Sequence, residues 1–125
     1  MDGILDFNQL QHEHKEWSVH NFPGQTPEEI ILKLGEETGE LMGAYTHLIR
    51  EYRGNKKRWE MEIEDAVGDI TIVLAGICSI LGIDYQVTVE KVWKDVKQRD
   101  WIKYPMNGIS EQIKEIDEQK QLERA

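Results

Sequence analysis

Apolar residues recur every three or four positions over two long stretches of this chain. The first stripe is Leu34, Thr38, Leu41, Tyr45, Leu48 and Tyr52, and the second is Trp59, Ile63, Ala66, Ile70, Val73 and Ile77. This spacing places the residues on one face of an α-helix, whereas a strand would need strict alternation. Helical patterns also cover about 4–19 and 84–102, and no segment has the pattern of a strand. The sequence therefore predicts an all-α fold.

Local signals mark where the helices begin and end. Thr26 is a good N-cap, Pro27 suits the first helical position, and Glu29 completes a capping box. Gly82 is expected to end the third helix. We predict an antiparallel helical bundle of about four helices in a single domain, 1–125. Its core would cover about 17–105, and the charged tail, 108–125, would be a short docked helix or frayed.

Charge and composition limit the partners and the compartment. The 125 residues carry a net charge of −9, which disfavours nucleic acid and anionic membranes, because binding to either needs Lys and Arg. The apolar run from Ile70 to Leu81 is too short to span a bilayer. It suggests a subunit interface, so a homodimer or homotetramer is expected. With one cysteine, Cys78, and no signal-peptide pattern, we expect a cytoplasmic protein.

Acidic residues border the apolar stripe on both long helices. They are Glu36, Glu37 and Glu40 on the first helix and Glu62, Asp65 and Asp69 on the second. At about 100° per residue, each set follows one edge of its helix's buried face, so helices packed side by side could bring the two sets together. Like charges gathered in this way need compensation, and Mg²⁺ prefers carboxylate, water and phosphate oxygens. The ordinary alternative is a solvated helix face.

Three glycines, Gly35, Gly39 and Gly43, repeat at four-residue intervals within the first long helix. Each costs about 1 kcal/mol relative to Ala inside a helix. Their alignment on one face suggests close approach by another helix or by a ligand.

At these residues the sequence resembles the all-α NTP pyrophosphatase superfamily, which includes MazG, MazG-like proteins, dimeric dUTPases and phosphoribosyl-ATP pyrophosphatase. The family signature is Glu-Glu-x-x-Glu on one helix and Glu-x-x-Asp on the next. Glu36, Glu37 and Glu40 match the first half, and Gly68-Asp69-Ile70 is similar to the end of the second. The resemblance covers roughly 17–105. It implies Mg²⁺-dependent hydrolysis between the α and β phosphates, with Mn²⁺ as a substitute metal.

The second half of the signature departs from the family pattern. The residue three before Asp69 is Ala66 instead of Glu, and the nearest acid is Asp65, four before it. A literal Glu-x-x-Asp occurs one turn earlier, as Glu62 and Asp65. We favour Asp65 with Asp69, because the Gly-Asp-Ile context and the apolar run align there.

The resemblance also implies roles for individual residues. Glu37, Glu40 and Asp69 would be the core Mg²⁺ ligands. Glu36 and Asp65 would complete the site, hold a second metal or orient the attacking water.

Candidate substrate-binding residues lie in three segments. Lys33, one turn before Glu36, either reaches a phosphate or pairs with an acid. By the resemblance, Trp17 and Asn21 belong to a base pocket, and the segment before Pro105 contacts phosphates and base through Lys97, Arg99, Lys103 and Tyr104. The ordinary alternatives are a core Trp, a turn Asn and cations that interact with a helix C-terminus.

The leading hypothesis is a nucleoside triphosphate pyrophosphohydrolase that clears unwanted nucleotides. Within the same class, the alternatives are a phosphoribosyl-ATP pyrophosphatase or a hydrolase restricted to dUTP or dCTP. From a different class, the alternative is a non-catalytic helical dimerisation or adaptor protein whose acids only decorate its surface.

Overall fold

The computed structural model of the chain describes residues 5–50, 54–109 and 111–124, with side chains for all of these except 111–117. Five helices and no strand occur within these ranges: α1 (Phe7–Asn21), α2 (Pro27–Ile49), α3 (Lys56–Leu81), α4 (Tyr85–Val96) and α5 (Glu111–Arg124). The all-α prediction is confirmed. Tyr52, the last residue of the first predicted stripe, lies outside the described residues.

The chain divides into two compact units, Met1–Gln86 and Val87–Ala125, and each is described by itself. The first unit holds α1, α2 and α3, and the second holds most of α4 together with α5. The predicted limits of a single domain, with a core at about 17–105, stay a prediction.

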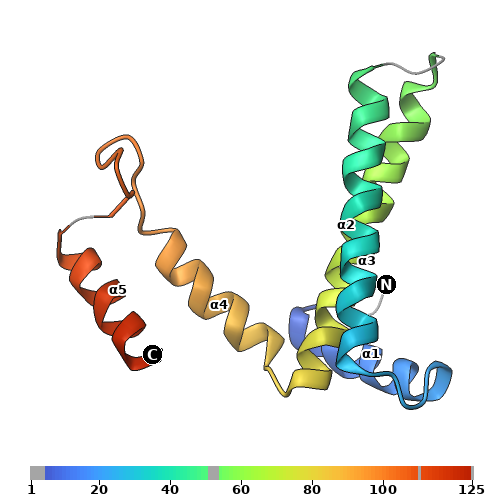
Figure 1. Cartoon of the computed structure of the whole chain (residues 1–125), viewed down its shortest axis with the longest axis horizontal. Coiled ribbons are helices and arrows are strands. Elements are labelled where there is room, and N and C mark those ends of the chain that lie inside the picture. The colour runs from blue at the N-terminus through green and yellow to red at the C-terminus, as the bar shows by residue number, and fades with distance from the viewer. Residues whose placement is uncertain (1–4, 51–53, 110, 125) are drawn as a thin grey trace. The chain divides into compact units, whose positions relative to one another are not determined.

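Helices α2 and α3 form a long hairpin in which they lie side by side and run in opposite directions (Figure 1). The predicted start of α2 is confirmed, since the Thr26 hydroxyl accepts a hydrogen bond from the Glu29 amide at 3.2 Å. Gly82 ends α3 as predicted. The start of α2 and the end of α3 were therefore visible in local sequence signals.

The buried line of α2 differs from the predicted stripe. Ile30, Glu37 and Ala44, spaced by seven, are its buried residues. Leu34 and Leu41 are only half-buried, and Tyr45 is exposed. The reason is that α3 covers one side of α2, and no other helix of the described first unit packs extensively against its remaining surface. Glu37 therefore lies on the centre line of the buried face.

Helix α1 packs against α3 at the end of the hairpin away from the α2–α3 connection (Figure 1). The side-chain amide of Gln11 donates to the Ile83 carbonyl at 2.7 Å, and its oxygen accepts from the Tyr85 amide at 3.0 Å. The rings of Phe7 and Tyr85 lie 4.8 Å apart between centroids, and Tyr85 is buried. These contacts tie α1 to the segment that follows α3.

In the second unit, α4 ends at Val96, earlier than the predicted end near 102. The Asp100 carboxylate accepts hydrogen bonds from the amides of Ile102 and Lys103 at 3.0 and 2.9 Å. These bonds form a separate turn after the helix, because Asp100 lies four residues beyond Val96. The charged tail forms α5, and Lys120 joins it to Asp95 of α4 at 2.7 Å.

No single helix among the described residues is long and apolar enough to cross a membrane. Helices α3 and α4 pass such a test only when they are taken together, by length and composition.

Candidate functional site

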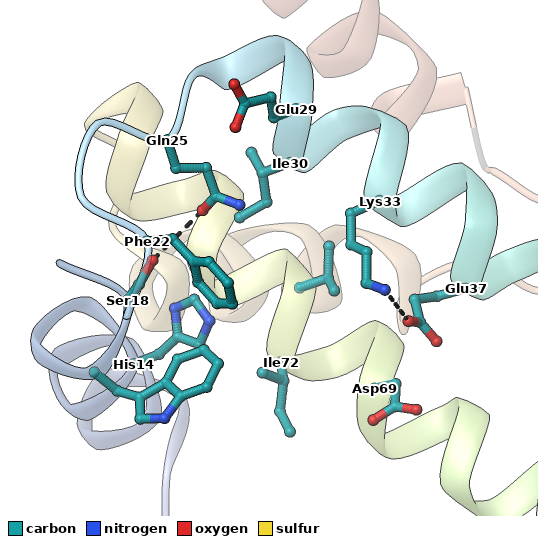
Figure 2. A pocket seen from close by; sticks show the side chains of 12 residues that line it. His14, Ser18, Phe22, Gln25, Glu29, Ile30, Lys33, Glu37, Asp69 and Ile72 are labelled. Carbon is teal, nitrogen blue, oxygen red and sulfur yellow. Dashed lines mark hydrogen bonds and ion pairs between the residues drawn. The ribbon is translucent and has the colours of Figure 1, made fainter. Parts of the chain in front are cut away.

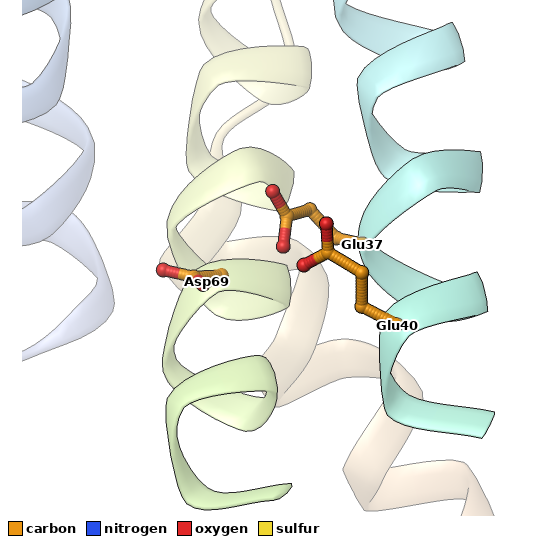
Figure 3. A group of neighbouring side chains, drawn as sticks. All are labelled: Glu37, Glu40 and Asp69. Carbon is orange, nitrogen blue, oxygen red and sulfur yellow. The ribbon is translucent and has the colours of Figure 1, made fainter. Parts of the chain in front are cut away.

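Two helices contribute three carboxylates to one small volume. Glu37 and Glu40 project from α2 toward α3, which carries Asp69 (Figure 3). One oxygen from each of the three lies within 4.8 Å of the others. Spacing on α2 and packing of α2 against α3 together produce this arrangement, which we call the acidic cluster. The three predicted core ligands are thus brought together, and their role as metal ligands stays a prediction.

Glu37 is the buried member of the acidic cluster, with 6% of its surface exposed. One of its oxygens, Oε1, lies 3.2 Å from the Lys33 ammonium. The other, Oε2, is enclosed and accepts no hydrogen bond from any described residue. A buried polar atom without a partner typically costs about 1–3 kcal/mol. The fold therefore maintains a costly arrangement that a cation at this position would relieve.

Repulsion within the acidic cluster is visible in Glu40. The negative charge of Glu37 raises the pKa of the Glu40 carboxyl above its ordinary value. Lys33 offsets part of the negative charge, because it lies close to Glu37 and also 3.6 Å from Glu36. A hydrogen bond with Glu37 and the charge of Glu36 raise the pKa of Lys33, so this side chain stays cationic at neutral pH.

A cavity of about 410 Å³ opens next to the acidic cluster, between α1, the start of α2 and the middle of α3 (Figure 2). One end is ionic and contains Lys33, Glu37 and Asp69. The other end is aromatic and apolar, with Trp17 and Phe22 among its walls. Its volume falls in the range typical of sites for small organic ligands.

The other two predicted acids lie outside the acidic cluster. Glu36 is exposed and shares Lys33 with Glu37. Asp65 is exposed on α3 and does not approach the other carboxylates closely enough to join them among the described residues. The same holds for Glu62. The expected pairing of Asp65 with Asp69 is therefore not seen as a shared cluster.

Position 66, where the family signature has Glu, is deeply buried. Ala66 is 3% exposed and precedes Asp69 by one helical turn on the same face. A carboxylate at this position would extend the acidic cluster along α3. In this chain a methyl group takes that place and contributes to the packing of the hairpin.

The predicted substrate residues separate into two groups. Lys33 and Trp17 line the cavity. Asn21 is exposed and does not line it, because its side-chain amide donates to the Trp17 carbonyl at 2.8 Å and thereby closes the end of α1. The remaining four lie in the second unit, after the end of α4, and their contact with substrate stays a prediction: Lys97, Arg99, Lys103 and Tyr104.

Sequence reasoning missed two residues of α1 that form the cavity wall beside the predicted Trp17. They are His14 and Ser18, which follow helical spacing and line the cavity together with Gln25 from the loop. The Ser18 hydroxyl donates to the Gln25 side-chain oxygen at 3.4 Å. The signal was the three- and four-residue spacing on α1. It was hidden because His14 and Ser18 are polar and do not extend an apolar stripe.

The close approach of another helix, expected at Gly35, Gly39 and Gly43, is not seen in the described part of the chain. A Cβ atom at any of them would meet no atom within 4 Å beyond the backbone of α2 itself. The physical reason is that α3 packs on the face of α2 that carries Glu37, about 200° away from Gly35 and Gly39.

Comparison of the chain with protein-family models, with curated proteins and with solved structures found no match.

Proposed function

We propose that this protein is an Mg²⁺-dependent nucleoside triphosphate pyrophosphohydrolase of the MazG-like kind, which converts (d)NTP and water to (d)NMP and pyrophosphate. The observation that carries the proposal is the buried Glu37 carboxylate, which has one oxygen without a hydrogen-bond partner among the described residues and belongs to a cluster with Glu40 and Asp69. This carboxylate lies at the ionic end of a cavity whose other end is aromatic. A nucleotide would match both ends, because its phosphates are anionic and its base is an aromatic ring.

The residues of the acidic cluster fit Mg²⁺. The donors are carboxylate oxygens, and this hard cation takes few protein ligands, with waters and substrate phosphates completing its shell. Glu37, Glu40 and Asp69 would hold it. When bound, Mg²⁺ supplies a Lewis acid for the phosphoryl oxygens and makes a bound water more acidic. Mn²⁺ would fit the same donors.

The remaining groups of the site would position the substrate. Lys33 stays protonated and lines the cavity, so its ammonium would contact phosphate oxygens. Glu36, which shares Lys33 with Glu37, would orient the attacking water or accept its proton. The water oxygen then bonds to the α phosphorus, the bond from this phosphorus to the bridging oxygen breaks, and pyrophosphate leaves.

We also propose that the protein works as a homodimer or homotetramer. Large apolar side chains on α2, such as Leu32, Met42 and Ile49, are more than half exposed in the single chain. Apolar area of this kind commonly marks an interface. The lone cysteine, Cys78, favours a reducing compartment, so we place the protein in the cytoplasm. The exposed apolar surface would equally serve a non-catalytic dimerisation or adaptor protein.

The decisive experiment measures pyrophosphate release from the eight common NTPs and dNTPs and from dUTP, with Mg²⁺ and with EDTA. We expect Mg²⁺-dependent release that leaves the monophosphate. Asp69→Asn should lower kcat by at least about a hundredfold, because it removes a carboxylate that holds the metal. Phosphoribosyl-ATP is included in the same assay, because the alternative function within this class is a phosphoribosyl-ATP pyrophosphatase.

Glu64→Gln is the matched control, since Glu64 is an exposed acid on α3 outside the acidic cluster. It should leave the rate within about twofold of the wild type. If a folded wild type releases no pyrophosphate from any of these substrates, or if Asp69→Asn and Glu64→Gln behave alike, the proposed function is wrong. The adaptor alternative then becomes the better explanation.

A further inference from the structure

We propose that His14 determines which ring enters the cavity, by donating a hydrogen bond from Nε2 to an acceptor at the edge of the nucleobase. The inference rests on the proposed function, because it assigns the ring end of the same site. His14 belongs to α1, and its side chain lines the aromatic end of the cavity with Trp17 and Phe22 (Figure 2).

The imidazole of His14 contacts residues of two helices. Its ring lies 5.5 Å from the Trp17 ring between centroids, at 45°. It also approaches Gly76 of α3, where an added Cβ would lie 2.7 Å from Cε1 and 3.3 Å from Nδ1. A side chain at position 76 would displace the ring. Gly76 thus provides the space that lets His14 lie against α3.

This packing makes the two ring nitrogens unequal. Nδ1 is enclosed and has no hydrogen-bond partner among the described residues. A buried N–H without an acceptor is rarer in proteins than an unsatisfied acceptor. The proton of the neutral ring should therefore reside on Nε2, which leaves Nδ1 as a bare nitrogen. Because His14 lines the cavity and its Nδ1 is enclosed, Nε2 is the ring nitrogen left to donate a hydrogen bond to a ligand.

A fixed hydrogen-bond donor in an aromatic pocket favours ligands that carry a hydrogen-bond acceptor on a ring. A phosphate chain needs no such group, because Lys33 and the acidic cluster lie at the other end. A ring carbonyl or ring nitrogen in the plane of a base would accept the hydrogen bond, while Trp17 and Phe22 contact its apolar surface. Sites that hydrogen-bond a ligand reject analogues without the matching group. The ligand class is therefore a planar heteroaromatic ring with an in-plane acceptor, linked to a polyphosphate.

The test measures ligand affinity by titration calorimetry in the presence of Mg²⁺, with two kinds of ligand. The first kind is the α,β-methylene nucleoside triphosphates of the common bases, which resist cleavage. The second is inorganic tripolyphosphate, which has no ring. Both are measured on the wild type, His14→Met and His14→Gln. Met keeps the length of the side chain without a donor, whereas Gln places an amide donor near the position of Nε2.

We expect His14→Met to weaken binding of the preferred analogue about tenfold, the usual scale for one lost hydrogen bond. His14→Gln should recover most of that loss, and tripolyphosphate should bind all three proteins equally. If the analogues and tripolyphosphate all fail to bind the wild type, the proposed function is wrong. If the analogues bind but His14→Met matches the wild type, or if Gln and Met lose equally, the donor role of His14 is wrong and the metal site stands.

A measurement on the wild type keeps the inference testable if a variant does not fold. Nitrogen-15 NMR of the imidazole distinguishes the two neutral tautomers. We expect His14 to carry its proton on Nε2, and we expect the Nε2 resonance to shift with the nucleotide analogue but not with tripolyphosphate. A proton on Nδ1 in the free protein would overturn the assignment.

Discussion

The pKa of the Glu40 carboxyl depends on the charges of the neighbouring side chains. This carboxyl is exposed, yet Glu37, one turn away, raises its pKa above the ordinary value of 4.5. A carboxyl with a raised pKa binds more protons in the folded state than in the unfolded state. Stability therefore falls as the pH rises from about 4.5 through the raised pKa. Glu40 thus opposes folding at neutral pH unless a cation is bound.

We predict that Glu40→Gln raises the melting temperature at pH 7 in EDTA, because it removes this repulsion. The same substitution should reduce the additional stabilisation that Mg²⁺ gives to the wild type. Thermal unfolding from pH 4 to 8, with EDTA and with Mg²⁺, measures both effects. A lower melting temperature in EDTA, or an unchanged response to Mg²⁺, would contradict the prediction.

His14 should produce the opposite pH dependence. Burial lowers its pKa from the ordinary 6.5, so the unfolded state binds the proton more readily. Stability therefore decreases as the pH falls from 6.5 through the lowered pKa. We predict that His14→Gln flattens this part of the stability profile, as followed by chemical unfolding between pH 4 and 7. An unchanged slope in His14→Gln would contradict the prediction.

At the scale of elements, α2 carries two separate faces. One packs against α3 and bears Glu37, while the other carries Gly35 and Gly39, with open space beside both. Repeated glycine is unfavourable in a helix and, on the second face, no contact within the described chain compensates for it. The contacts of α2 within the described chain therefore do not explain why glycine occurs at positions 35 and 39.

We predict that Gly35→Ala stabilises the isolated chain by about 1 kcal/mol, because Ala is the better helix former and its Cβ meets no described neighbour. Urea unfolding at protein concentrations low enough to keep subunits apart measures this. Destabilisation under those conditions would show that the face is in close contact with something. Sedimentation of the same variant at high concentration then reports whether a second subunit approaches there.

At the scale of the whole molecule, the α2–α3 hairpin couples stability to the chemistry of the site. Its buried residues among those described are few, and one of them is an acid: Ile30, Glu37, Ala44, Ala66, Val73, Ala75 and Gly76. A charge within so small a core is costly, and anything that binds only the folded state stabilises it. Mg²⁺ or a nucleotide bound at the site should therefore raise the stability of the whole hairpin.

Ala66→Glu tests this coupling directly. Without metal, a fourth carboxylate at a buried position should destabilise the protein by about 2 kcal/mol or more. Mg²⁺ should restore more stability to this variant than to the wild type, because the added carboxylate is one turn from Asp69. Ala66→Gln has the same shape without charge and should show no such recovery. Equal responses of the two variants to Mg²⁺ would argue against a metal site next to position 66.

The sequence by itself determined the helices and the candidate acids. Helical spacing, the Thr26 cap and Gly82 are local signals, and they predicted the start of α2 and the end of α3. The early end of α4 was missed because the amides of Gln98 and Arg99 bond to carbonyls three residues back and the Asp100 amide bonds to the Gly108 carbonyl, which apolar spacing does not reveal.

Only the tertiary structure decided which acids meet. Glu37, Glu40 and Asp69 come together, while Asp65 does not, because the packing of α2 on α3 sets their mutual rotation and register. The cavity also depends on contacts between distant segments, since His14 of α1 lies where Gly76 of α3 leaves space. Periodicity describes one helix at a time, and such contacts depend on how two helices face each other.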